Sequence, residues 1–338
     1  MKKFDLLVYI GRFQPPTTAH IATINMALKE SEHVLVIVGS SYQARTVKNP
    51  FTFAERKNML QDTLGKNNAS MHYAAVRDNL YNNAAWAAEV QKVVAGEVYD
   101  IFGSKEVKIG IIGHKKDESS FYLDMFPQWE FVPNFFFQGI NATDIRDEFF
   151  SSGKSVSGNI SVGAFLKQFK TTAEYTRLAE EHKYLTAYKK SWEAAPYPPT
   201  FVTADAVVEQ SGHILLVQRG AAPGEGLWAL PGGFVNQFES IEDAAIRELR
   251  EETKLKVPAP VLRGSIEWSD VFDNPFRSLR GRTITHAFMF RLPPGELPKV
   301  KGSDDAKFAK WFPISEVLKM EELLFEDHYS IIRRMMGI

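Results

Sequence analysis

The sequence contains no cysteine, which excludes disulfide bonds and cysteine-ligated zinc. It also lacks long hydrophobic runs, because no segment approaches the ~18 apolar residues that a membrane-spanning helix needs. The N-terminus, MKKFDLLVYIGRF, holds only a short apolar run before Gly11, Arg12 and Gln14, so it is no secretory signal peptide. We therefore expect a cytoplasmic protein without a membrane segment.

The chain also lacks an excess of either charge. Its formal net charge is −1, and no basic block indicates a nucleic-acid partner. With 44% hydrophobic and 24% charged residues, its composition is ordinary for a soluble globular protein. Since domains usually hold about 100 to 200 residues, a chain of 338 residues predicts two domains.

The first half alternates buried strands with helices. The runs DLLVYI, HVLVIVG, MHYAAV and VKIGIIG are rich in apolar residues, and a helical pattern lies near 19–31. This alternation predicts an α/β fold with a Rossmann-like, doubly wound parallel sheet. Ligands bind such sheets beyond the carboxyl ends of the strands, where Gly11, Gly39 and Gly113 fall.

A proline-rich segment separates the two halves. The chain is helical and polar over about 161–192, and EAAPYPPT then ends the helix. We place the first domain at 1–185, a linker at 186–200 and the second domain at 201–338. In the second domain, FVTADAVVEQSGHILLVQR predicts a hairpin through Ser211 and Gly212. Further strands near 261–268 and 283–291, with helices near 314–320 and 326–336, predict a mixed sheet between helices.

The segment GFVNQFESIEDAAIRELREETKL, residues 233–255, carries an unusual concentration of acids. Glu248, Glu251 and Glu252 have the spacing of one helix face, which would bring three carboxylates together. Such repulsion is tolerable when Mg²⁺ lies among the oxygens. For RELREE alone, a solvated acidic helix face is the better interpretation. The metal-site interpretation becomes the better one when the upstream residues Gly233, Glu239 and Arg247 are included. Glu239 is placed to accept from Arg247 and thereby to orient the helix.

The full spacing resembles the signature box of the Nudix hydrolases. That box runs Gly, five residues, Glu, seven residues, Arg-Glu, aliphatic, any residue, Glu-Glu, any residue, Gly, aliphatic, and Leu249 and Leu255 fill its aliphatic places. Lys254 stands where the box has Gly, at a cost of about 1 kcal/mol or a shift of the helix end. The resemblance implies a Nudix α/β/α sandwich with a mixed sheet. It implies metal ligands at Glu248, Glu251 and Glu252, supported by Gly233, Glu239 and Arg247.

A second group of candidate residues follows the first strand. GRFQPPTTAH, residues 11–20, places Arg12 before a helix and His20 in its first turn, where free N–H groups favour phosphate. Taken alone, His20 is more often a packed or surface histidine. INATDIR, residues 140–146, adds Thr143 at a helix start and Arg146 one turn later, an arrangement suited to a triphosphate.

Together these segments resemble the nucleotidylyltransferase superfamily. Thr17 and His20 fill the outer places of its motif His-or-Thr, any residue, Gly, His, and Thr143 and Arg146 match its motif Ser, any residue, Thr, two residues, Arg. Ala19 replaces the Gly of the first motif and Asn141 the Ser of the second. We interpret both as tolerated variants, since Ala is small and Asn caps helices well.

Three further segments narrow this resemblance. GSSYQARTVKNPFTFAERKNML, RDNLYNNAAW and GHKKDESSFYLDMFPQW are similar to the archaeal-type nicotinamide mononucleotide adenylyltransferases. In that family the mononucleotide's 5′-phosphate attacks the α-phosphorus of ATP and pyrophosphate leaves. The resemblance implies that His20 and Arg12 contact the transferring phosphates, and that Thr143 and Arg146 hold the outer phosphates. It further implies an ATP and substrate site that includes Gly11, Phe13, Thr17, Asn79, Trp86 and Gly113. Trp86 would stack on nicotinamide, although a core position is equally consistent with its surroundings.

The Nudix box does not determine which diphosphate is cleaved. DVFDNPFRSLRGRTITHAF, residues 270–288, is similar to the corresponding region of ADP-ribose pyrophosphatases. Arg280 and Arg282 there would meet phosphates or remain solvated loop arginines. Glu252 and Glu248 are the candidate catalytic carboxylates. The general base is Glu252 or a later acid, namely Glu267, Asp304 or Asp305.

These resemblances imply a bifunctional enzyme of NAD metabolism that uses ATP, nicotinamide mononucleotide and ADP-ribose with Mg²⁺. An alternative is an adenylyltransferase whose Nudix domain senses ADP-ribose without cleaving it. The sequence leaves open whether nicotinic acid mononucleotide is the acceptor, whether Mn²⁺ replaces Mg²⁺, and whether the chain forms a homo-oligomer.

Overall fold

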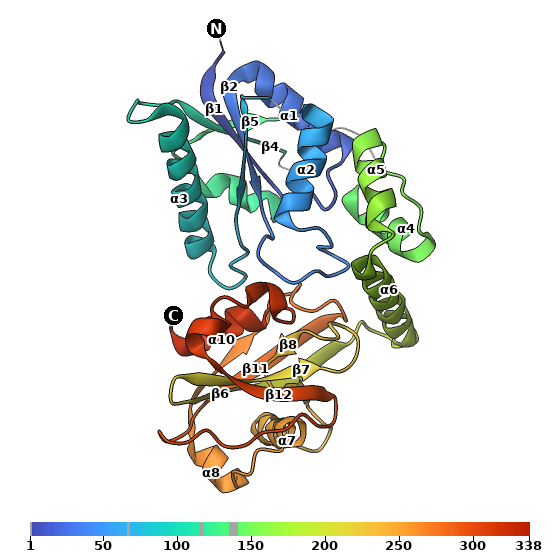
Figure 1. Cartoon of the computed structure of the whole chain (residues 1–338), viewed down its shortest axis with the longest axis vertical. Coiled ribbons are helices and arrows are strands. Elements are labelled where there is room, and N and C mark those ends of the chain that lie inside the picture. Colours follow the sequence, from blue (N-terminus) through green and yellow to red (C-terminus); the bar gives the residue numbers. More distant parts are fainter. Residues whose placement is uncertain (1, 66–67, 115–117, 135–140) are drawn as a thin grey trace. The chain divides into compact units, whose positions relative to one another are not determined.

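The computed structural model describes residues 2–65, 68–114, 118–134 and 141–338 (Figure 1). The chain divides into two compact units, Met1–Glu180 and Glu181–Ile338. The predicted linker of residues 186–200 begins inside helix α6, which ends at Ser191. Within the described part of the chain, no helix is long and apolar enough to cross a membrane.

The first unit contains a five-stranded, wholly parallel sheet with the order β3-β2-β1-β4-β5. This confirms the predicted doubly wound sheet. The strands are β1 (Phe4–Gly11), β2 (Ser31–Val38), β3 (Met71–Ala75), β4 (Ile109–Gly113) and β5 (Glu130–Pro133). The helices are α1 (Thr18–Glu30), α2 (Phe53–Leu64), α3 (Asn83–Phe102), η1 (Glu118–Met125), α4 (Ala142–Ser152), α5 (Ile160–Phe169) and α6 (Ala173–Ser191).

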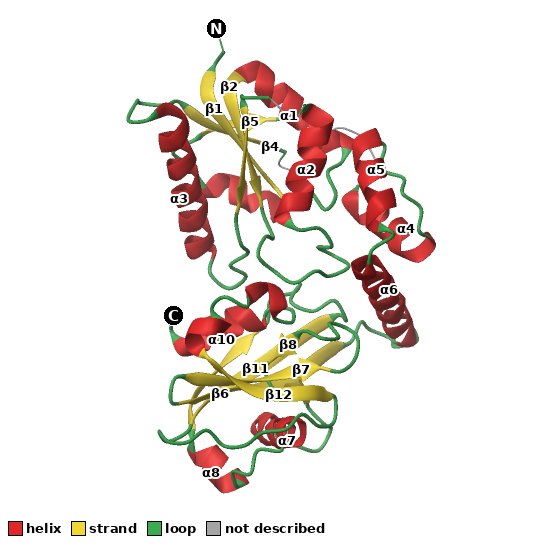
Figure 2. Ribbon diagram, in the orientation of Figure 1, coloured by secondary structure: helices red, strands yellow, loops and turns green. Residues whose placement is uncertain are grey.

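Strand β1 is buried on both faces, and its side chains alternate between two cores. Leu6 and Val8 belong to the core that includes α3 and η1, whereas Leu7 and Tyr9 belong to the core that includes α1 and α2. Figure 2 shows α3 on one side of the sheet and α1 and α2 on the other. The sheet order changes direction at the border between β1 and β4, so the carboxyl ends of these two strands flank the crevice where such folds bind ligands.

The second unit contains a seven-stranded mixed sheet, as predicted. Its main path runs β10-β11-β6-β7-β12, with β8 on β7 and β9 on β6, and the β11–β6 pair is parallel. The strands are β6 (Thr200–Gln210), β7 (His213–Arg219), β8 (Trp228–Ala229), β9 (Gly232–Phe234), β10 (Ile266–Phe272), β11 (Arg282–Arg291) and β12 (Ala306–Pro313). The helices are α7 (Ile241–Thr253), α8 (Ala259–Gly264), α9 (Ile314–Val317), η2 (Glu321–Leu323) and α10 (His328–Met336).

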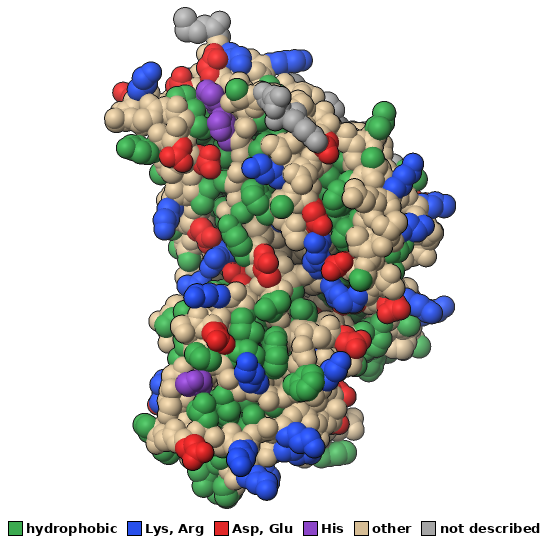
Figure 3. Space-filling model, viewed as in Figure 1, with side chains coloured by type: hydrophobic (Ala, Val, Ile, Leu, Met, Phe, Trp, Pro, Cys, Tyr) green, Lys and Arg blue, Asp and Glu red, His purple; other side chains and the backbone are tan. Residues whose placement is uncertain are grey.

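Helix α7 packs on one face of this sheet through small and apolar side chains. Ala244, Ala245 and Leu249 are fully buried against strands β6, β7 and β11, while the acidic and basic side chains of the helix lie outside this core. Figure 2 shows α7 and α8 on one side of the sheet and α10 on the other. On the face drawn in Figure 3, acidic and basic side chains of the described residues are interspersed.

The sequence correctly located the β6–β7 hairpin. Ser211 and Gly212 both have positive φ, at 50° and 75°, which is the backbone of the favoured two-residue hairpin turn. The strand expected at 261–268 was wrong in its first part, because residues up to Gly264 form α8. Pro258 at the helix N-cap presets the backbone for the start of this helix. Strands β5 and β12 were not predicted.

The end of α7 shows how the chain accommodates its departure from the Nudix pattern. Lys254 adopts the left-handed conformation, with φ 51°, and its N–H donates to the Arg250 carbonyl. The helix therefore ends at the position where the pattern has Gly. A non-glycine residue there costs roughly 1 kcal/mol.

A buried ion pair connects the β10–β11 loop to the start of α10. Arg277 Nε and Nη2 donate to the two Asp327 carboxylate oxygens at 2.9 and 2.8 Å. Their side chains are only 2% and 1% exposed. Both side chains are almost fully removed from water, and Asp327 accepts two of the Arg277 N–H groups. Asp205 and Glu326 add further negative charge near Arg277.

We predict that Asp327→Asn lowers the free energy of unfolding by about 3–5 kcal/mol, because it removes the carboxylate that the buried Arg277 guanidinium contacts directly. Urea unfolding of the full chain measures this. Arg263→Met is the control, since Arg263 pairs with Glu242 at the exposed surface and its loss should change stability by about 1 kcal/mol or less. Equal effects of the two substitutions would contradict the prediction.

Two candidate active sites

In the first unit, His20 is oriented by the start of α1. Thr17 N–H donates to His20 Nδ1 at 2.9 Å, and the Thr17 hydroxyl lies 3.0 Å from the same nitrogen. A backbone N–H can only donate, so Nδ1 is the acceptor and the neutral ring carries its hydrogen on Nε2. Burial and then the neighbouring Arg12 guanidinium lower the pKa of His20 to about 4. His20 is therefore a neutral hydrogen-bond donor at physiological pH.

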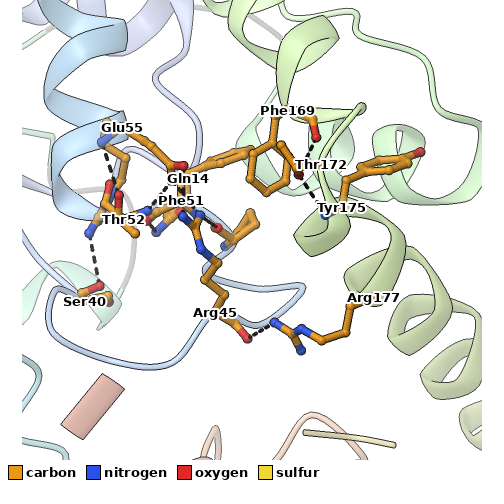
Figure 4. A network of polar contacts seen from close by, with 12 residues as sticks. Gln14, Ser40, Arg45, Phe51, Thr52, Glu55, Phe169, Thr172, Tyr175 and Arg177 are labelled. Carbon is orange, nitrogen blue, oxygen red and sulfur yellow. Dashed lines mark hydrogen bonds and ion pairs between the residues drawn. The ribbon is translucent and has the colours of Figure 1, made fainter. Parts of the chain in front are cut away.

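Buried polar contacts fix the loops that follow β1 and β2. Arg56 is fully buried and donates to the carbonyls of Arg12 and Gly39 at 2.7 and 2.6 Å. Gln14 donates to the Phe51 carbonyl at 2.8 Å and accepts from the Phe51 N–H at 3.0 Å (Figure 4). These bonds hold the segment that carries Arg12 and His20 against the segment that precedes α2.

Figure 4 also shows how the loop before α2 is tied to its surroundings. Arg45 makes a two-pronged contact with the Glu55 carboxylate, at 2.6 and 2.9 Å. Arg177 of α6 donates to the Arg45 carbonyl at 3.2 Å. Thr52 begins α2 in a reciprocal cap with Glu55.

Helix α4 brings the second predicted motif to the same loop. Arg146 donates to the Gln14 carbonyl at 2.6 Å and to the Thr143 hydroxyl at 3.2 Å. Asn141 accepts from the Asp144 N–H at 2.9 Å, so it caps α4 as expected of a residue replacing Ser. The structure thus brings Arg12, His20, Thr143 and Arg146 into one neighbourhood.

Several cations crowd this neighbourhood. Burial, and then Arg12, lower the pKa of Arg146 to about 10. Burial and Arg12 also lower the pKa of Lys48, with Asp78 opposing them. Sequence reasoning missed Lys48, because it lies in a loop without a recognised spacing. Repulsion among these cations is relieved when a polyphosphate binds among them.

The remaining predicted residues of the first site lie around the strand ends. Gly11 and Gly113 are the last residues of neighbouring strands, and a Cβ on Gly11 would approach the Phe13 ring to 2.8 Å. Trp86 is half-buried against the core beside Tyr122, with ring centroids 6.1 Å apart. The Asn79 amide donates to Glu89. Of the quoted sequence segments, residues 115–117 and Ile140 lie outside the described residues.

In the second unit, a cavity of about 260 Å³ lies between α7, β9 and the loops near α10. Both acidic residues and arginines line its wall. The acidic residues are Asp205, Glu248, Glu252, Asp304, Asp305 and Glu326. The basic residues are Arg219, Arg247, Arg277 and Arg280, and Phe234 and His328 also line the cavity.

Arg247 organises the acidic segment. Its Nε and Nη2 donate to the two Glu239 oxygens at 2.9 and 2.7 Å, and its Nη1 donates to Glu248 and Glu251 at 2.8 and 2.9 Å. Hydrogen bonding to Arg247 lowers the pKa of Glu239 to about 2. A Cβ at position 233 would overlap the Glu248 carboxylate, which explains why this position requires Gly.

The predicted metal ligands are only partly brought together. Glu248 and Glu252 line the cavity, whereas Glu251 does not, although Glu248 and Glu251 both accept from Arg247 Nη1. Among the described residues, no three His, Asp or Glu side chains lie close enough to hold a metal ion. Burial raises the pKa of Glu248, and burial raises the pKa of Glu252 to about 8 despite a hydrogen bond from the Gly232 N–H. This excess of buried carboxylates fits a hard divalent cation.

Some of the other predicted residues of this site line the cavity and others do not. Arg280 lines the cavity with its guanidinium 5.0 Å from the Phe234 ring centroid, whereas Arg282 lies outside it and donates to the Asp273 carbonyl. Glu267 pairs with Arg291 and does not line the cavity, unlike Asp304 and Asp305.

Five ionisable lining residues were not among the predicted site residues, namely Asp205, Arg219, Arg277, Glu326 and His328. Asp205, Arg219 and Arg277 stood within quoted segments, but Glu326 and His328 are far from the Nudix box and follow no spacing rule. Only the fold brings them to it.

Comparisons with known proteins cover both units. Residues 8–148 match the cytidylyltransferase-like family and residues 199–335 match the NUDIX domain. A crystal structure of a bifunctional NMN adenylyltransferase/ADP ribose pyrophosphatase from Francisella tularensis is 36% identical, with a TM-score of 0.93 over 99% of each chain. The chain belongs to this bifunctional family.

Separate relatives resemble each half. A nicotinamide/nicotinic acid mononucleotide adenylyltransferase from Acinetobacter baylyi is 35% identical over 54% of this chain and 96% of its own length. An ADP-ribose pyrophosphatase from Methanocaldococcus jannaschii is 38% identical over 39% of this chain and 70% of its own length. A second Francisella tularensis structure, complexed with AMP and a Mn ion, has 35% identity and a TM-score of 0.90 over 99% of each chain.

The lowered pKa of His20 predicts that the stability of the folded chain depends on pH. Its pKa in the folded chain, about 4, lies below the unfolded value near 6.5, so folding favours the neutral ring. This contribution is present above pH 6.5 and is lost as pH falls toward 4. His20→Asn retains an acceptor for the Thr17 N–H but does not titrate. We expect the unfolding free energy of the wild type to fall more steeply than that of His20→Asn between pH 6.5 and 4; parallel curves would refute this.

Proposed function

We propose that this chain catalyses two reactions of NAD metabolism. The first transfers an adenylyl group from ATP to nicotinamide mononucleotide, giving NAD and pyrophosphate. The second hydrolyses ADP-ribose to AMP and ribose 5-phosphate. The observation that carries the proposal is the full-length likeness to the bifunctional Francisella tularensis structure, combined with cationic and carboxylate sites in the corresponding units.

In the first reaction, the protein positions the reactants and stabilises charge. The 5′-phosphate of the mononucleotide attacks the α-phosphorus of ATP, the α–β bridging P–O bond breaks, and pyrophosphate leaves. Arg12 and Lys48 compensate the negative charge on the transferring group, and neutral His20 donates through Nε2. Thr143 and Arg146 hold the leaving phosphates, with Arg146 fixed by the Gln14 carbonyl.

In the second reaction, Glu248 and Glu252 would hold Mg²⁺, and Glu251 would join them if its contact with Arg247 were exchanged. When bound, the metal would compensate the charge of the diphosphate and would lower the pKa of a water molecule. Arg280 is placed to contact phosphate, and Asp304 or Asp305 is placed to take a proton from the attacking water. The carboxylates in the cavity favour hydrolysis over sensing alone.

The first test is chromatography of reactions with purified protein, Mg²⁺ and either ATP with nicotinamide mononucleotide or ADP-ribose alone. We expect NAD in the first reaction and AMP in the second. Glu252→Gln should lower AMP formation by about 10²–10³-fold, since it removes a charged ligand, and should leave NAD formation within about twofold. NAD without AMP in the wild type would identify the second unit as a sensor or as a hydrolase of another diphosphate.

The choice of acceptor is tested by competition. Equal concentrations of nicotinamide and nicotinic acid mononucleotide are supplied with limiting ATP, and the two dinucleotide products are separated. If the dinucleotide of nicotinic acid dominates the products, nicotinic acid mononucleotide replaces nicotinamide mononucleotide as the proposed acceptor.

Lys48 provides a further test of the first site. Lys48→Met should lower kcat/KM for NAD formation by about 10–100-fold, because it removes one cation from the phosphate neighbourhood. Lys48→Arg should retain more activity than Lys48→Met. Hydrolysis of ADP-ribose by the same preparations is the internal control. Unchanged NAD formation in Lys48→Met would exclude Lys48 from the site.

A further inference from the structure

His328 lies at the start of α10 and lines the cavity of the second unit. Its side chain is deeply buried, since the residue is only 6% exposed. The Phe325 ring packs edge-on against the imidazole, with centroids 5.6 Å apart. Position 328 is far from the Nudix box in sequence.

One hydrogen bond fixes the tautomer of His328. The Leu230 N–H donates to Nδ1 at 2.9 Å in a buried contact. Because Nδ1 accepts, the neutral ring carries its hydrogen on Nε2. Burial lowers the pKa of His328 to about 3, although neighbouring Asp327 opposes this shift. The imidazole therefore stays neutral and cannot repel the arginines beside it.

Among the described residues, the His328 side chain makes its hydrogen bond through Nδ1 alone. Since the residue lines the cavity, Nε2–H is available to donate to a ligand there. The charged lining residues that act on His328 include Arg277, Arg219 and Arg280, which favour an anionic ligand. A diphosphate ester linked to ribose offers several acceptor oxygens and no competing cation.

We infer that His328 is a substrate-binding residue whose Nε2–H donates to an oxygen of the diphosphate substrate. The inference rests on the proposed hydrolysis of ADP-ribose. The two ring nitrogens then have different roles. Nδ1 accepts from the backbone N–H of Leu230, before β9, and Nε2–H donates to the ligand. The acceptor is an oxygen of the AMP part or of the ribose phosphate part.

Two substitutions separate the tasks of the two nitrogens. His328→Asn places an acceptor near the position of Nδ1 and so preserves the bond from Leu230, but its short amide puts no donor at the position of Nε2. His328→Gln places its amide near the position of Nε2 and so restores a donor. If the donor matters, His328→Asn should lower kcat/KM for ADP-ribose by about 10–100-fold, and His328→Gln should recover at least about fivefold of that loss.

The full-length chain supplies its own controls. NAD formation and the thermal unfolding midpoint are measured on the same preparations, and both should match the wild type in His328→Asn. Equal kcat/KM in the Asn and Gln variants, whether high or low, would overturn the inference. The inference requires His328→Gln to be more active than His328→Asn, because only Gln restores a donor at the position of Nε2.

Calorimetric titration with AMP and with ADP-ribose locates the acceptor. Equal weakening of both ligands in His328→Asn places the oxygen on the AMP part, and weakening of ADP-ribose alone places it on the ribose phosphate part. Unweakened binding of both would again overturn the inference. These titrations decide the role of His328 even if the wild type binds ADP-ribose without cleaving it, an outcome that would refute the proposed hydrolysis instead.

Discussion

Both sites depend on keeping charged side chains out of water while their hydrogen bonds remain satisfied. In the first unit, the buried Arg56 guanidinium donates to carbonyls of the two loops that follow β1 and β2. In the second, Arg277 and Asp327 compensate each other beside the cavity. In each arrangement, the hydrogen bonds of a buried charged group hold together segments that are far apart in sequence. The side chains of the proposed sites are positioned by those segments.

The two units also use the same means to obtain an uncharged donor. His20 and His328 each accept a backbone N–H at Nδ1, and burial lowers both pKa values well below 6.5. A protonated imidazole among Arg12 or Arg280 would add repulsion to a region that is already cationic. A neutral ring adds a directed N–H without adding charge, which suits a site that must release as well as bind anionic products.

The sequence predicted what local patterns determine. Alternating apolar runs located β1, β2, β3 and β4, a Ser-Gly pair located the β6–β7 hairpin, and the Nudix spacing located α7. It did not predict β12 or the contribution of His328, because both depend on pairings between distant segments. It also grouped Glu251 with Glu248 and Glu252, from helical spacing and from the resemblance to the Nudix box. Spacing gives the direction of a side chain from the helix axis but does not include the competition of Arg247 for that carboxylate.

The contacts of Arg247 also determine the charge balance of the acidic segment. Three carboxylates, Glu239, Glu248 and Glu251, share the single guanidinium of Arg247, so negative charge remains in excess before the buried Glu252 is considered. Glu239 takes the two-pronged contact and holds Arg247 in place, which leaves Glu248 and Glu251 with one shared donor atom. A divalent cation compensates this excess better than protonation does, because it also retains positions for water and phosphate oxygens. The number of carboxylates in this segment therefore supports the proposed cation, and Arg247 orients them without neutralising them.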